Sequence, residues 1–242
     1  MDLNADVGEG MDDRPLLPFL TSANIACGMH AGGPLIMDRT VSLALSRRVQ
    51  VGAHPGYADR DNFGRTAVDL PLDELRALVL YQVAALDGFV RAHGGRLAHV
   101  KAHGALYNRA ARDPTVAGAV AEAVRAFSTD LILVGLAGSM QLGAARLVGL
   151  RAAGEAFADR RYLPDGSLMP RSEAGAVLHD AKDAAAQAAL IAREGQVIAS
   201  DGSRVRVEAE TICLHGDTKG AAAIARAVRD RLESDGVPIA PL

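Results

Sequence analysis

The chain has 242 residues, of which 23% are charged and 49% hydrophobic, and its formal net charge is −3. This composition excludes a disordered chain, because low charge and a full apolar complement allow a core to form. It also argues against nucleic-acid binding, which needs a strongly basic face. No apolar run approaches the roughly 20 residues that span a bilayer, and the first residues, MDLNADVGEG, do not resemble a signal peptide. We therefore expect a cytoplasmic protein with neither nucleic-acid nor membrane partners.

Short β-type runs alternate with helical periodicity along most of the chain. In chain order, the expected strands are Met1–Val7, Ser22–Cys27, Gln50–His54, Leu97–His103, Leu131–Leu136, Gly154–Ala158 and Glu210–His215. The expected helices are Pro34–Arg48, Leu72–His93, Pro114–Phe127, Ser139–Leu150, Ala181–Arg193 and Lys219–Ser234. This alternation predicts βαβ units and a parallel sheet in a single domain, residues 1–242. Residues 196–208 break the pattern, and their Asp201-Gly202 pair predicts an antiparallel hairpin.

Polar residues recur on one face of several expected strands. They are Asp2, Asn4 and Asp6 on the first strand, His99, Lys101 and His103 on the fourth, Glu155 and Asp159 on the sixth, and His215 and Asp217 on the last. An open sheet with helices on both faces would bury these charges against apolar side chains, at several kcal/mol each. We therefore predict a seven-stranded (β/α) barrel whose polar interior opens at its carboxyl-terminal mouth, where such barrels carry their active sites.

Histidines at the ends of expected strands are candidates for proton transfer or metal binding. His30 lies in CGMHAGG and His54 in GAHPG, where the flanking glycines allow a ligand to approach the backbone. His99 and His103 would be about 13 Å apart on a strand, too far to share one ion, so we place His103 at the mouth and His99 deeper. Lys101, between them, is a natural anchor for phosphate or carboxylate.

Two later segments are candidates for binding an anion. Glu155, Asp159 and Arg160 lie in EAFADRRY, and with Arg171 they suit either an anionic ligand or a surface run of ion pairs. Residues 214–220, LHGDTKG, form a glycine-containing turn before the last helix, a typical phosphate site. The turn at residues 135–139, GLAGS, could serve the same purpose. A Walker A loop, H-E-x-x-H, G-x-S-x-G and a full G-x-G-x-x-G are all absent from the sequence.

Long motifs in fixed order resemble the LamB/YcsF (lactam utilisation) family. They are DLNADVGEG, SANIACGMHAGGP, GAHPGYADRDNFGR, VKAHGALYN, EAFADRRY, LMPRS and LHGD, and they span nearly the whole chain. The sequence departs from the family pattern at Met29, Gly33 and Ala102, where Phe, Asp and Pro are usual. The acid missing at Gly33 argues against a role for that loop in cation binding.

This resemblance implies a barrel of the glycoside hydrolase/deacetylase type and a 5-oxoprolinase, which opens the lactam of 5-oxoproline to L-glutamate with ATP. It also implies partner subunits B and C, and a divalent cation, Mg²⁺, could accompany the ATP. The expected catalytic residues are Asp6, His30, His54, Lys101, His103, Glu155 and Asp159. The expected substrate-binding residues are Asn4, Asn24, Arg65, Asn108, Arg160, Tyr162 and Arg171, and the expected phosphate-binding residues are His215, Gly216, Asp217 and Lys219.

Two other functions remain open at this point. One is a metal-dependent hydrolase or deacetylase that acts alone, with Asp6, His30, His54 and His103 around a divalent ion. The other is a non-catalytic subunit that binds a ligand or a partner. The sequence leaves open whether the chain forms a homo-oligomer, and whether it binds ATP itself or at a subunit boundary.

Overall fold

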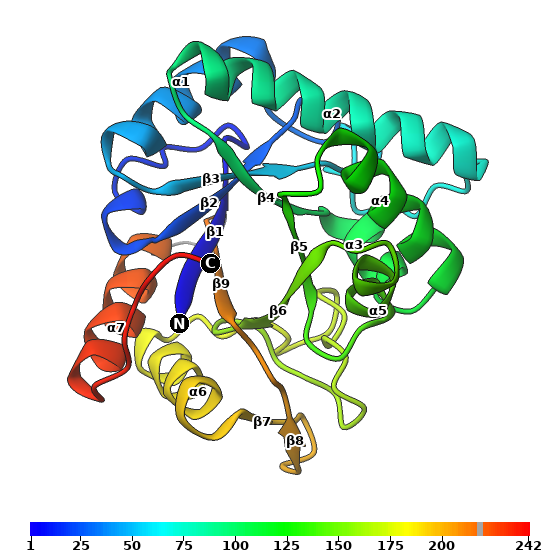
Figure 1. The fold of residues 1–242 in the computed structure, drawn as a ribbon. Helices are drawn as coiled ribbons and strands as arrows, with labels where there is room; N and C mark the ends of the chain where they lie inside the picture. Colours follow the sequence, from blue (N-terminus) through cyan, green and yellow to red (C-terminus); the bar gives the residue numbers. More distant parts are fainter. Residues whose placement is uncertain (217–219) are drawn as a thin grey trace.

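The strands form a closed barrel at the centre of the computed structural model, which describes residues 1–216 and 220–242. All neighbouring strands are parallel, in the order β1-β2-β3-β4-β5-β6-β9 (Figure 1). They are β1 (Asp2–Val7), β2 (Ser22–Ala26), β3 (Gln50–His54), β4 (Leu97–Lys101), β5 (Ile132–Leu136), β6 (Arg151–Phe157) and β9 (Thr211–His215). The predicted seven-stranded barrel is confirmed.

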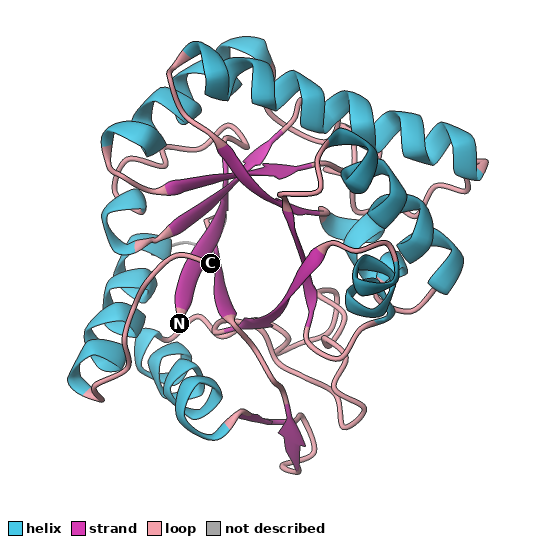
Figure 2. Ribbon diagram, viewed as in Figure 1, coloured by secondary structure: helices cyan, strands magenta, loops and turns pink. Residues whose placement is uncertain are grey.

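Helices cover the outside of this barrel, as Figure 2 shows. They are η1 (Leu17–Phe19, a 3₁₀ turn), α1 (Pro34–Ser46), α2 (Leu72–Ala92), α3 (Gly104–Ala110), α4 (Pro114–Phe127), α5 (Met140–Leu147), α6 (Ala181–Glu194) and α7 (Ala221–Ser234). Within residues 1–216 and 220–242, none of the helices combines the length and apolarity required to cross a membrane.

Local chemistry fixes the ends of several helices. Asp113 accepts hydrogen bonds from the amides of Thr115 and Val116 at the start of α4, which satisfies donors that have no partner within the helix. The side chain of Asp180 caps α6 in the same way, and α6 ends at Gly195 in the left-handed conformation (φ +62°).

The two faces of the strands differ in polarity as predicted. On β1, Leu3, Ala5 and Val7 belong to the apolar core. Asn4 instead donates a hydrogen bond to Glu155 on β6, which is not a neighbour of β1 in the sheet. This bond therefore crosses the barrel interior, so the polar faces of the strands point inward and meet there.

The chain differs most from expectation after β4. This strand ends at Lys101 rather than His103, and α3 follows, a seven-residue helix that the sequence pattern does not predict. The backbone turns at Gly104 (φ +52°), where a Cβ atom would lie 2.6 Å from the carbonyl oxygen of Gly64. Most other element ends agree to within three residues. The expected start of the last helix, Lys219, lies outside the described residues.

A small hairpin separates α6 from β9. Strands β7 (Gln196–Ile198) and β8 (Arg204–Arg206) pair antiparallel, and Gly202 between them has φ +87°. The amide of Ser200 donates to the carbonyl of Tyr162, which ties the hairpin to the loop after β6. The hairpin thus lies outside the barrel and braces one loop at its mouth.

Candidate active site at the mouth of the barrel

The carboxyl-terminal ends of the strands surround a cavity of about 360 Å³. Expected site residues gather around it: Asp6, His54, Arg65, Lys101, His103, Asn108, Arg160, Arg171, His215 and Gly216 all line the cavity. These residues come from both halves of the chain, and the barrel brings them to one place, as predicted.

Lys101, at the end of β4, is the central cation at the base of this cavity. Its Nζ lies 2.9 Å from Oδ1 of Asp6 and 3.0 Å from Oε1 of Glu155, and it donates to Sγ of Cys213 at 3.0 Å. Burial opposes the charged form, but the interactions with Asp6, Cys213 and Glu155 raise the pKa of Lys101 well above its usual value. The ammonium therefore stays charged between two carboxylates.

Asp6, at the end of β1, is shared between Lys101, His54 and Asn24. Its Oδ1 accepts from Nδ2 of Asn24 at 2.9 Å, and its Oδ2 lies 3.3 Å from Nε2 of His54. Burial would raise the pKa of Asp6, but the charges of His54 and Lys101 hold it well below its usual value. Burial in turn lowers the pKa of His54, but Asp6 outweighs it, and the net shift is upward. Asp6 is thus an anion at neutral pH.

Asn4 and Asn24, expected to bind substrate, do not line the cavity. Asn4 donates to Oε1 of Glu155 at 3.0 Å, and Asn24 donates both to Asp6 and to the side-chain oxygen of Asn4. Asn24 also accepts from Nε2 of His99 at 2.8 Å, which places His99 deep in the interior. These amides hydrogen-bond to the two carboxylates and so hold them in position.

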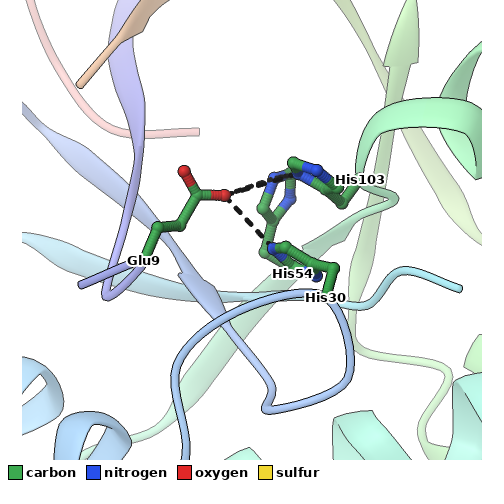
Figure 3. Close-up of side chains that lie close together, drawn as sticks. All are labelled: Glu9, His30, His54 and His103. Carbon is green, nitrogen blue, oxygen red and sulfur yellow. Dashed lines mark hydrogen bonds and ion pairs between the residues drawn. The ribbon is translucent and has the colours of Figure 1, made fainter. Parts of the chain in front are cut away.

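Glu9, His30, His54 and His103 meet at one side of the cavity (Figure 3). Oε1 of Glu9 lies 3.2 Å from Nε2 of His30, 3.4 Å from Nδ1 of His103 and 4.0 Å from Nε2 of His54. The rings of His54 and His103 approach to 2.9 Å between Nε2 and Nδ1. His30 reaches this cluster from the loop after β2, the same loop in which the family acid is replaced by Gly33.

Backbone carbonyls fix the orientation of two of these rings. Nδ1 of His54 donates to the carbonyl of Lys101 at 2.8 Å, and Nε2 of His103 donates to the carbonyl of Phe63 at 2.8 Å. A carbonyl can only accept, so each ring keeps its other nitrogen, unprotonated in the neutral form, for the cluster. Burial and the charge of His54 lower the pKa of His30 to about 3 and that of His103 to about 2.

Four arginines and an asparagine also line the cavity: Arg65, Arg112, Arg160, Arg171 and Asn108. Arg160 donates to the carbonyl of Met169 at 2.6 Å, and its buried Nε has no hydrogen-bond partner among the described residues. Burial and the nearby charge of Arg171 lower the pKa of Arg160 to about 10, so it remains charged at neutral pH. Arginines therefore give the cavity lining several cationic groups that suit an anion.

The remaining expected residues support the site from outside the cavity. Asp159 accepts from Nδ1 of His215 at 2.8 Å and from its amide at 3.0 Å, so it orients His215. Tyr162 is fully buried, and its hydroxyl accepts from the amide of Phe157. Asp217 and Lys219, expected to bind phosphate, lie outside the described residues.

Four further residues of the site were not predicted from the sequence: Glu9, Tyr107, Arg112 and Cys213. Glu9 follows Gly8, whose positive φ (+72°) turns the chain back over the barrel, and an acid in the GEG turn after a strand is the signal for it. Tyr107, which lies on α3, donates to Oε2 of Glu155 at 2.8 Å, and Arg112 lies just beyond the end of α3. Both depend on a helix that the sequence pattern does not predict.

Comparisons with known proteins match the whole length of this chain. The model of the LamB/YcsF family matches residues 1–242. The A subunit of the 5-oxoprolinase of Methylococcus capsulatus is 52% identical over 248 residues, which cover 100% of this chain and 95% of that protein. The crystal structure of a lactam utilization protein from Thermus thermophilus superposes with a TM-score of 0.94 at 45% identity, covering 100% of this chain and 99% of that one.

Proposed function

Because the chain belongs to the LamB/YcsF family, we propose that it catalyses the ATP-dependent opening of 5-oxoproline to L-glutamate. The name of the relative from Methylococcus capsulatus supports a hydrolase acting on 5-oxoproline, as one component of a larger enzyme. The proposed partners are accordingly subunits B and C.

The observation that carries this proposal is a buried lysine–carboxylate pair beside a cationic cavity. The ammonium of Lys101 lies 2.9 Å from Asp6, and both line a cavity that four arginines also line. Such a cavity suits a small substrate with a carboxylate at one end and a developing oxyanion at the other. 5-Oxoproline has both features.

An unstrained amide needs activation before water can open it, and ATP is the proposed phosphoryl donor, with Mg²⁺ on its phosphates. Transfer of the γ-phosphoryl group to the lactam oxygen releases ADP. Water then adds to the former carbonyl carbon, and the ring C–N bond breaks as the nitrogen takes up a proton. A second water hydrolyses the resulting acyl phosphate to glutamate and phosphate.

The side chains at the mouth suit these steps. Asp6 is an anion placed to take a proton from water, and His54 and His103 can carry a proton to the departing nitrogen. Lys101 and the turn after His215 would neutralise charge on the phosphoryl group. Arg65, Arg160 or Arg171 would bind the substrate carboxylate, and the unpartnered Nε of Arg160 is a free donor for it.

The test is glutamate formation from 5-oxoproline, measured with ADP release in the presence of all three subunits. We expect turnover to need ATP and subunits B and C. Asp6→Asn and Lys101→Met should each lower it by on the order of 100-fold or more. Asp61→Asn and Lys182→Met, which change the same groups at exposed positions, should not. Normal turnover in a mouth variant would remove that residue from the mechanism, and absence of glutamate from the complete wild-type system would reject the function.

A further inference from the structure

The four donor atoms beside Asp6 have the spacing of a tetrahedral metal site. Ligands about 2.0–2.1 Å from a zinc ion at the centre of a tetrahedron are about 3.3–3.4 Å from one another. Oε1 of Glu9 lies 3.2 Å from His30 Nε2, 3.4 Å from His103 Nδ1 and 4.0 Å from His54 Nε2. The two ring nitrogens of His54 and His103 are 2.9 Å apart, and all four atoms lie within 4.8 Å of one another.

Hydrogen bonds outside the cluster aim ring lone pairs at its centre. His54 and His103 each donate their outer N–H to a backbone carbonyl, that of Lys101 and that of Phe63. This is the arrangement by which proteins hold metal-ligating histidines in one tautomer. In the neutral rings two lone pairs face each other at 2.9 Å, a contact that only a cation or a proton between them can relieve.

The cluster is also rigid and largely shielded from water. His30 and His103 stack with ring centroids 3.7 Å apart, and the side chain of Glu9 is only 4% exposed. Glycines allow this packing: a Cβ on Gly56 would lie 2.8 Å from Nδ1 of His30, and one on Gly64 would lie 2.7 Å from Cβ of His30. The donor atoms are therefore held together by the fold before any ion arrives.

We propose that Glu9, His30, His54 and His103 form a binding site for one divalent transition-metal ion of the zinc class, in the wall of the cavity beside Asp6. Three imidazoles and one carboxylate are donors that zinc prefers, whereas Mg²⁺ prefers oxygen ligands in an octahedron. The ion would offset the negative charges of Glu9 and of Asp6, whose Oδ2 lies 3.3 Å from Nε2 of His54. Four protein ligands fill a tetrahedral coordination shell, so when bound such an ion would hold these side chains together as a closed site.

Metal titration of the purified full-length chain tests the site without relying on lactam turnover. After removal of metal with a chelator, Zn²⁺ binding is measured by calorimetry and Co²⁺ binding by visible absorption. We expect one ion per chain and the intense absorption of tetrahedral Co²⁺, reversed by Zn²⁺ but not by Mg²⁺. Glu9→Gln and His30→Gln should each weaken Zn²⁺ binding by on the order of 100-fold. The control is His93→Gln, which changes an exposed histidine at the end of α2 and should leave binding unchanged.

Three results would overturn the proposal. Absence of saturable Zn²⁺ binding would mean that a proton alone lies between His54 and His103. Equal Zn²⁺ affinity of wild type, Glu9→Gln and His30→Gln would place the ion elsewhere. The weak spectrum of octahedral Co²⁺ would exclude the proposed tetrahedral coordination by four side chains. If one variant fails to fold, the other variant still tests the ligands, and the cobalt spectrum of the wild type still tests the tetrahedral geometry.

Discussion

Replacement of Lys101 by methionine tests whether the fold depends on the charge at the centre of the site. The change removes an ammonium that lies 2.9 Å from Asp6 and 3.0 Å from Glu155, and it leaves both carboxylates buried without their cation. At an effective dielectric constant of 20, each contact corresponds to an attraction of about 5–6 kcal/mol, opposed by the cost of taking the charges out of water. Removing one partner of such a buried pair costs about 3–5 kcal/mol, and here two carboxylates lose the same partner. We therefore expect a loss of about 5 kcal/mol in the free energy of unfolding.

The assay is urea unfolding at pH 7, with Lys182→Met as the control for loss of an exposed lysine. The slope of the unfolding free energy against urea should stay constant, so that a lower midpoint reports a change in stability. Adding Glu155→Gln to Lys101→Met removes one of the two abandoned charges and should restore part of the loss. The reasoning is refuted if Lys101→Met unfolds within about 1 kcal/mol of the wild type.

Three further predictions concern neighbouring residues. Burial raises the pKa of Asp13 to about 6 from 3.8. The free energy of unfolding should therefore fall as the pH rises from about 4 to 6, whereas a salt-bridged acid would make it rise with pH. Asp13→Asn, which can still accept from the amide of Gly8, should therefore be more stable than wild type by up to about 3 kcal/mol at pH 7. The difference in stability between the two proteins, measured by thermal unfolding, should vanish below pH 4. A difference that does not change with pH would contradict this. Tyr107→Phe removes the donor to Oε2 of Glu155 and should cost about 1.5–3 kcal/mol in urea unfolding, whereas an unchanged midpoint would mean that another donor replaces it. Gly64→Ala combines a left-handed backbone (φ +65°) with a clash at His30 and should cost about 2–4 kcal/mol, clearly more than Gly202→Ala, where φ is +87° but nothing lies within 4 Å; equal losses would show that the clash is relieved.

The sequence predicts the barrel well because its signal is repeated along the chain. Several strands carry polar residues at alternate positions, and only an inward-facing polar surface reconciles Asp6, Lys101 and His215 with helices outside. The short helix α3 could not be predicted in this way, because seven residues show too little periodicity. This helix depends instead on packing of Leu106 and Tyr107 into the core.

Within the site, the residue types can be predicted from the sequence, but which of them line the cavity and which lie behind it cannot. Asn4 and Asp6 lie on the same face of β1, yet only Asp6 lines the cavity, since depth along the strand decides exposure. Glu9 lies beyond the strand, where alternation no longer applies, and the turn at Gly8 brings it back to the histidines. A residue that a loop brings to the site cannot be predicted from the alternating pattern of a strand.

The hydrogen-bonded barrel interior also constrains how this protein can change over generations. Thr211 donates to Asp2 and accepts from Asn4, Asn4 accepts from Asn24, and Asn24 accepts from His99. Each side chain therefore supplies a hydrogen-bond partner that its buried neighbour needs. Substituting one of them by an apolar residue leaves a buried polar atom of its neighbour without a hydrogen-bond partner. Lineages should therefore either keep the whole chain of bonds or replace several members together, while the outer loops drift one residue at a time.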